Sequence, residues 1–114
     1  MITFYPLASR KHQTNRLRLH KGTVEEVNFD LAALEEDLGT VDSVTWTVEA
    51  GQATIGDEAL ASSVATAEIT VAEVGTSRIS VKFTNTSNGQ SHYESVHVRS
   101  WEPEISFESD GYET

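Results

Sequence analysis

The sequence lacks cysteine altogether and has only two prolines and one methionine among its 114 residues. The absence of cysteine excludes disulfide bonds and thiolate metal ligands, and it fits a reducing compartment. No run approaches the roughly 18 consecutive apolar residues of a membrane span, and the N-terminus lacks the apolar core of a secretory signal. We therefore expect an unexported chain without membrane contact, with room for one domain and one hydrophobic core.

Basic residues are scarce, because eight lysines and arginines stand against eighteen acidic residues, which gives a net charge of -10. Residues 1–21 contain no acid, whereas residues 102–114 contain acids and no base. The bases of residues 1–21 are Arg10, Lys11, Arg16, Arg18 and Lys21. We interpret residues 1–21 as a basic N-terminal arm and residues 102–114 as an acidic C-terminal tail. Such an arm either neutralises its own domain or reaches an acidic neighbour.

Between the two termini, apolar residues alternate with polar ones in several short runs. The alternating runs are 27–31, 44–48, 67–71, 79–83 and 96–98. This period of two predicts strands with one buried face, and the glycines between the runs predict turns. Asn88-Gly89 indicates a hairpin, with a loop wider than two residues because residues 85–91 are all polar. Weaker alternation at Leu17 and Leu19 allows the arm to add an edge strand.

One segment follows a different period. Leu31, Leu34 and Leu38 have helical spacing, and Asp30 stands where a capping residue is expected. The sequence therefore predicts an all-β fold for residues 22–101, an antiparallel β-sandwich with one short helix. A small closed barrel is the structural alternative.

Three segments of this body carry a resemblance to known proteins. They read Ser-Val-Thr-Trp-Thr-Val-Glu-Ala-Gly-Gln-Ala-Thr-Ile at 43–55, Ala-Glu-Ile-Thr-Val-Ala-Glu-Val-Gly-Thr-Ser-Arg-Ile-Ser-Val-Lys-Phe at 67–83 and Val-His-Val at 96–98. Residues 22–100 resemble a bacterial immunoglobulin-like domain and are similar to the short immunoglobulin-like modules of tailed-bacteriophage virion proteins. The resemblance implies an immunoglobulin-like sandwich with extended N- and C-terminal segments, and Trp46 as the core tryptophan of a central strand. It also implies a virion or surface-associated structural module. We expect a virion protein that is made in the host cytoplasm.

Residues suited to catalysis or metal binding are few. His92 and His97 are five apart on a predicted strand, so they point to opposite faces and cannot share a metal. Phosphate-binding glycine loops and the nucleophile elbow are missing from the sequence. Acidic pairs such as Glu25-Glu26 and Asp57-Glu58 lack the Asp-x-Asp ladder of calcium loops. We therefore predict a non-enzymatic protein without catalytic residues, cofactor or metal.

Partner binding is the remaining interpretation, and the arm offers most of the groups for it. The predicted contact residues are Phe4, Tyr5, Arg10, Lys11, Arg16, Arg18 and Trp101. Phe4 and Tyr5 would form an apolar hook, while Trp101 follows the last strand and either closes the sandwich or anchors the tail. The bases would also suit phosphates, but the acidic body would repel a nucleic acid, so we predict a protein partner.

These expectations together suggest a capsid decoration or cement protein, whose arm crosses capsid subunits. A head-tail connector, neck or tail component is the alternative in the same setting, and an immunoglobulin-like module for adhesion to host-surface glycans is the alternative of another class. The major capsid protein or another virion protein would be the partner, and copies could associate into a trimer or ring. Removal of residues 1–21 is expected to leave a folded β domain that no longer binds.

Overall fold

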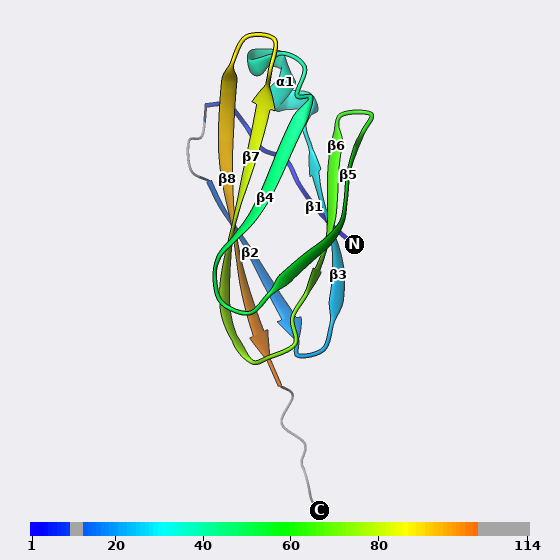
Figure 1. Cartoon of the computed structure of the whole chain (residues 1–114), viewed down its shortest axis with the longest axis vertical. Coiled ribbons are helices and arrows are strands. Elements are labelled where there is room, and N and C mark those ends of the chain that lie inside the picture. The colour runs from blue at the N-terminus through cyan, green and yellow to red at the C-terminus, as the bar shows by residue number, and fades with distance from the viewer. Residues whose placement is uncertain (10–12, 103–114) are drawn as a thin grey trace, which may run out of the picture.

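The structure is a computed structural model that describes residues 1–9 and 13–102. The strands are β1 (Ile2–Phe4), β2 (Gln13–His20), β3 (Val24–Asp30), β4 (Ser43–Ala50), β5 (Thr54–Ala61), β6 (Val64–Thr70), β7 (Gly75–Asn85) and β8 (Gln90–Trp101), and the helix is α1 (Ala32–Leu38). One sheet has the order β1-β3-β6-β5 and the other the order β2-β8-β7-β4. The two sheets face each other as a sandwich, with α1 at one end (Figure 1). The all-β fold with one short helix is thus confirmed.

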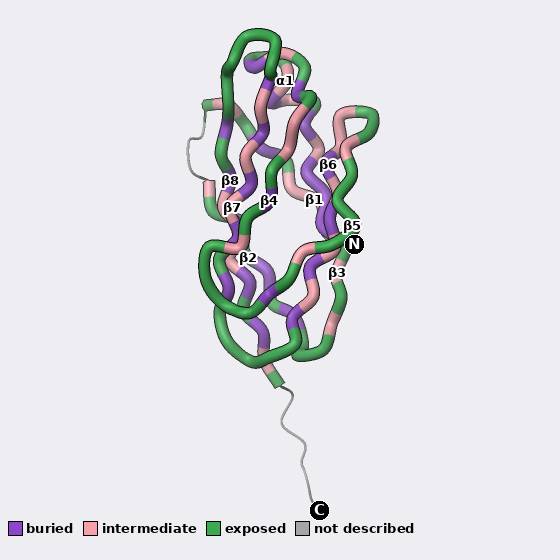
Figure 2. The backbone as a smooth tube through the Cα atoms, in the orientation of Figure 1, coloured by how far each residue is buried: buried purple, intermediate pink, exposed green. Residues whose placement is uncertain are grey.

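The core lies between the two sheets, and the residues of the alternating runs that form it are buried (Figure 2). Phe29 of β3 is at its centre, because its ring lies 5.2 Å from the ring of Phe83 and 5.6 Å from that of Trp46. Burial of such rings supplies much of the hydrophobic stabilisation of a small domain. Trp46 is therefore a core residue, as predicted. It lies on the edge strand β4, however, so its expected place on a central strand is wrong.

The sheets are mixed rather than purely antiparallel. β1 pairs with β3 in parallel, and β2 pairs with β8 in parallel, while the remaining pairings are antiparallel. The chain changes sheet after β1 and again after β2, so each of these strands lies beside a strand that is distant in sequence. Neighbours of this kind are not joined by a hairpin and are free to run in the same direction.

Residues 1–21 do not form a separate arm, because they contribute β1 to one sheet and β2 to the other. Leu17 and Leu19 of β2 are each only 5% exposed, and the whole of β2 is in register with β8. The apolar face of β2 requires this burial, and the weak alternation at these leucines was its signal in the sequence. Residues 10–12 and 103–114, which include most of the predicted tail, lie outside the described residues.

The helix and the last hairpin follow the prediction closely. Leu31, Leu34 and Leu38 are buried as expected. The N-cap residue is Leu31, however, so Asp30 stands one residue before the predicted capping position, where it accepts a hydrogen bond from the backbone N–H of Ala32 at 3.1 Å. A loop of residues 86–89 joins β7 to β8, and Gly89 adopts a φ of 77°, which glycine tolerates without steric cost. Within the described part of the chain, no helix is long and apolar enough to cross a membrane.

Candidate docking face

The outer face of the sheet β2-β8-β7-β4 collects basic side chains from three strands. In β2, Leu17 and Leu19 point into the core, so Arg16 and Arg18 point outward. The same alternation turns the basic residues Arg78 and Lys82 of β7, and His97 and Arg99 of β8, outward. We define the basic face as Arg16, Arg18, Arg78, Lys82, His97 and Arg99.

Strand register places these side chains side by side. Arg16 lies opposite His97, which in turn lies opposite Arg78 on the next strand. One step further along, Arg18 lies opposite Arg99. Residues that face each other across neighbouring strands have Cβ atoms about 4.5–5.5 Å apart, so the two rows concentrate positive charge.

The rows border a shallow hollow of about 300 Å³. Its lining consists of Arg16, Leu17, Arg18, Thr76, His97 and Arg99. Over residues 1–9 and 13–102, the ion pairs are Met1 with Glu25 and His92 with Glu94, so the guanidinium groups of the basic face are not paired with any described carboxylate. A cationic hollow of this kind suits carboxylates or other anions of a partner.

Cations cover the aromatic rings of this face. The ring centroid of Trp101 lies 4.0 Å from that of His20, and the guanidinium carbon of Arg18 lies 5.8 Å from the Trp101 centroid. The ammonium nitrogen of Lys82 lies 5.7 Å from the ring centroid of Tyr93, which is 45% exposed. Trp101 thus contacts outward-pointing residues of β2 and does not close the end of the sandwich. Cation–π contacts of this kind also hold the cationic groups in place.

The other predicted contact residues have different positions. Phe4 of β1 is half-buried, with its ring centroid 5.4 Å from that of Phe29, so it belongs to the core and not to an apolar hook. Tyr5 follows β1 and is 64% exposed. Arg10 and Lys11 lie outside the described residues. The structure therefore brings together Arg16, Arg18 and Trp101, and separates Phe4 from them.

Sequence reasoning missed Arg78, Lys82 and Arg99, because it assigned the positive charge to the N-terminal residues alone. Each of the three lies next to alternating core residues such as Val81 and Val98, which is the signal that places it outside. Five of the six lysines and arginines within the described residues lie on the basic face, and the sixth, Lys21, follows the end of β2.

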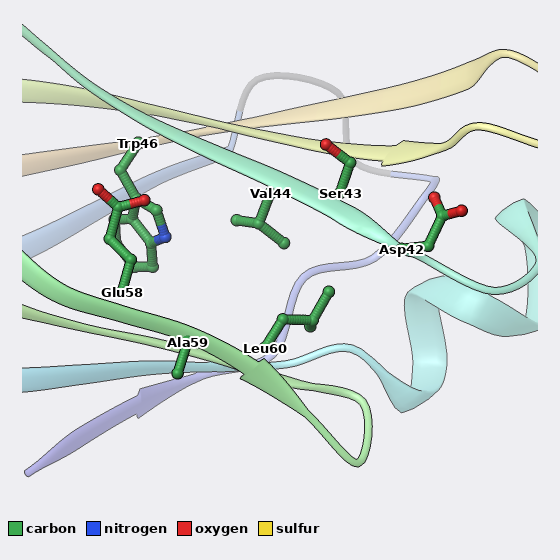
Figure 3. Close-up of a pocket in the computed structure, with 7 residues that line it drawn as sticks. All are labelled: Asp42, Ser43, Val44, Trp46, Glu58, Ala59 and Leu60. Atoms are coloured by element: carbon green, nitrogen blue, oxygen red, sulfur yellow. The ribbon is translucent and has the colours of Figure 1, made fainter.

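A second hollow lies between the edge strands β4 and β5 (Figure 3). It measures about 360 Å³ and is lined by Asp42, Ser43, Val44, Trp46, Glu58, Ala59 and Leu60. Asp42 accepts hydrogen bonds from the backbone N–H of Thr86, at 3.0 Å, and from its hydroxyl. The hydroxyl bond is the main cause that lowers the pKa of Asp42. The lining contains two carboxyl groups, those of Asp42 and Glu58, and no histidine or lysine.

A buried polar cluster lies on the inner side of the sheet β2-β8-β7-β4. The Nε2 atom of His92 lies 2.5 Å from a carboxylate oxygen of Glu94, and the Asn15 amide donates to the other oxygen at 2.9 Å. His97 points outward, so the prediction that His92 and His97 face opposite sides is confirmed. Across the described ranges no group of three or more histidine, aspartate or glutamate side chains is arranged to hold a metal ion.

Comparisons with known proteins found no matching family model and no match among curated proteins. Among solved structures, the chain is similar to the cysteine protease inhibitor EhICP2 from Entamoeba histolytica, at 12% identity and a TM-score of 0.42, over 86% of this chain and 96% of that one. It is also similar to Amebosin, at 14% identity and a TM-score of 0.33, over 86% of this chain and 97% of that one.

Proposed function

We propose that this chain is a non-enzymatic structural protein of a bacteriophage virion with an immunoglobulin-like sandwich, which decorates the capsid by docking its basic face on an acidic protein surface. The observation that carries the docking role is the concentration of bases on one sheet face of a chain with a net charge of -10. The capsid as the setting rests on the sequence resemblance of residues 22–100.

The docking element in this proposal is a preformed sheet face and not an extended arm. A strand fixed in a sheet holds its side chains in position before the partner arrives, whereas ordering a free arm costs roughly 1–2 kcal/mol per residue. Arg16 and Arg18 keep the role predicted from the sequence, and Arg78 and Arg99 join them. Trp101 holds Arg18 through its ring.

Weak individual contacts are sufficient for such a role. An exposed ion pair contributes about 0.2–1 kcal/mol, so a few arginines give a modest affinity for each copy. Copies that also contact one another on the lattice would bind more tightly, because binding of one copy raises the effective concentration of the next at its site. The same face would serve a ring at the neck or tail, which remains the alternative location.

The contacts of the Trp101 and Tyr93 rings favour a protein partner over a single-stranded nucleic acid. Proteins that bind single strands stack bases on free aromatic faces between their basic residues. Here Trp101 is in contact with His20 and Arg18, and Tyr93 is in contact with Lys82. Because cationic side chains already contact these rings, nucleic-acid bases would stack on them poorly.

Co-sedimentation of the full chain with empty phage capsids that lack a decoration protein tests the proposal. We expect saturable binding at a fixed ratio to the capsid protein, lost as salt rises from about 0.01 M to about 1 M, because the Debye length falls from about 30 Å to about 3 Å. Failure to bind at low salt would overturn the capsid setting.

Matched variants separate the sheet face from the N-terminal segment. Arg99 lies on the basic face but is far in sequence from the N-terminal basic residues. Lys21 belongs to those N-terminal basic residues but is not part of the basic face, so Arg99→Gln and Lys21→Gln form a matched pair. We expect Arg99→Gln and Arg16→Gln to weaken binding about equally, and Lys21→Gln to leave it nearly unchanged. Equal losses for Lys21→Gln and Arg16→Gln, with none for Arg99→Gln, would restore the N-terminal segment as the docking element.

A further inference from the structure

The outer face of the other sheet carries the opposite charge. Glu26 of β3 lies directly opposite Glu68 of β6. On the other side of Glu68 the register with β5 is irregular between Gly56 and Ala59, and Asp57 stands in this irregular stretch with a φ of 50°. We define the acidic face as Glu26, Asp57 and Glu68.

The three carboxylates of the acidic face repel one another. The neighbouring charge of Asp57 is the largest cause that raises the pKa of Glu68, and Glu26 adds to it. Like charges directly opposite each other on neighbouring strands destabilise a sheet. Within the described residues no salt bridge joins a cation to any of the three. The Met1 ammonium is paired with Glu25 and attracts Glu26 as well, and a cationic partner would relieve the repulsion that remains.

The basic and acidic faces belong to different sheets of one sandwich, so they point away from each other (Figure 1). The acidic face of a molecule therefore cannot reach its own basic face. A second copy can supply the missing charge to either face, since each copy carries both.

We propose that copies of this chain associate head to tail, with the acidic face of one copy docked on the basic face of the next. The proposal rests on the proposed function, because it names a partner for the same docking face. Glu26 and Glu68 of one copy pair with Arg16 and Arg99 of the other, and the hollow between the arginine rows receives the carboxylates. Such a contact joins unlike surfaces, so it generates a chain or a closed ring and not a two-fold dimer.

Sedimentation velocity of the full chain, at rising protein concentration, tests this association. At about 0.01 M salt we expect species that grow beyond a dimer, and at about 1 M salt we expect monomers, because screening removes the attraction. A monomer at every concentration in low salt would overturn head-to-tail association. If capsid binding persisted in that case, the proposed function would stand without it.

Two neutralised variants then test which faces meet. E26Q/E68Q removes charge from the acidic face, and R16Q/R99Q removes it from the basic face. Each variant alone should associate at least about tenfold more weakly than the wild type. An equal mixture should form one-to-one dimers and nothing larger, because the intact acidic face of one variant meets the intact basic face of the other. Circular dichroism melts of both variants would check that the fold is retained.

The two variants measured separately also distinguish the acidic face from other sources of negative charge. If E26Q/E68Q still associates as the wild type does while R16Q/R99Q does not, another acidic segment occupies the basic face and the proposal is overturned. A chain truncated after Glu102 would then show whether residues 103–114 are that segment. Larger species in the mixture would equally contradict a contact between these two faces.

Discussion

At the scale of single residues, the buried contact between His92 and Glu94 concerns stability and not docking. His92 and Glu94 both lie on the inner side of β8, and Asn15 from β2 completes the group. The contacts join two strands that are distant in sequence. Because burial makes an unpaired polar group costly, both His92 and Asn15 depend on the carboxylate of Glu94.

Glu94→Ala is therefore expected to lower the free energy of unfolding by about 1–3 kcal/mol, because it leaves His92 without its buried partner and Asn15 with only the backbone carbonyl of Ser95 as an acceptor. Urea denaturation measures the change. Ser95→Ala, on the outer side of the same strand, is the matched control and should stay within about 0.5 kcal/mol of the wild type. Similar midpoints for both variants would show that the cluster does not hold the strands together.

Glu68 gives a prediction about pH, because Asp57 and Glu26 raise its pKa. A carboxyl group whose pKa is raised in the folded state binds more protons there than in the unfolded chain. Stability then falls as pH rises from the ordinary glutamate pKa through the raised one. We expect Glu68→Gln to be more stable than the wild type at pH 7, and the difference to vanish below about pH 3. Denaturation of dilute protein at several pH values measures the difference in stability between Glu68→Gln and the wild type. A difference that grows toward acid pH would contradict the raised pKa of Glu68.

At the scale of elements, the alternating runs and the helix were predictable because each carries its burial pattern within a few residues. β5 was missed, since Gly56 and the exposed residues 56–59 interrupt any period of two, and the strand is irregular at the same place. Strand order was also beyond prediction, because alternation reports which side of a strand is buried and not which strand lies beside it. The rows of the basic face depend on that order. Arg99 could be placed outside from sequence, but not beside Arg18.

The structure reverses the expectation that the domain folds without residues 1–21. A chain of residues 22–114 lacks β1 and β2, so it loses Leu17 and Leu19 from the core and leaves β8 with an open edge. Each lost leucine costs about 2–5 kcal/mol, against a total stability of about 5–15 kcal/mol for a typical domain. We expect a broad, non-cooperative melt by circular dichroism. Removal of residues 103–114 leaves every described strand in place and serves as the control, and a cooperative melt of both truncations would contradict this role of β2.

At the scale of the whole molecule, the net charge of -10 conceals a separation of charge between two faces. The sequence showed separation along the chain, with bases near the N-terminus. Folding converts it into separation across the sandwich, because Arg78, Lys82 and Arg99 from the acidic body join Arg16 and Arg18. A partner that approaches the basic face meets a positive local potential, because salt screens the acids of the far sheet beyond about 8–10 Å.

The folded chain should therefore bind a cation-exchange resin at pH 7 and about 0.1 M salt, where the far acids are screened, although its net charge is negative. Arg99→Gln and Arg16→Gln should each elute at lower salt than the wild type, whereas Lys21→Gln should elute close to it, because only the first two lie in the rows of the basic face. All three variants change the net charge by the same amount, so a shift common to all would reflect net charge alone. Passage of the wild type through the resin without retention would show that the basic face is too weak to bind an acidic surface.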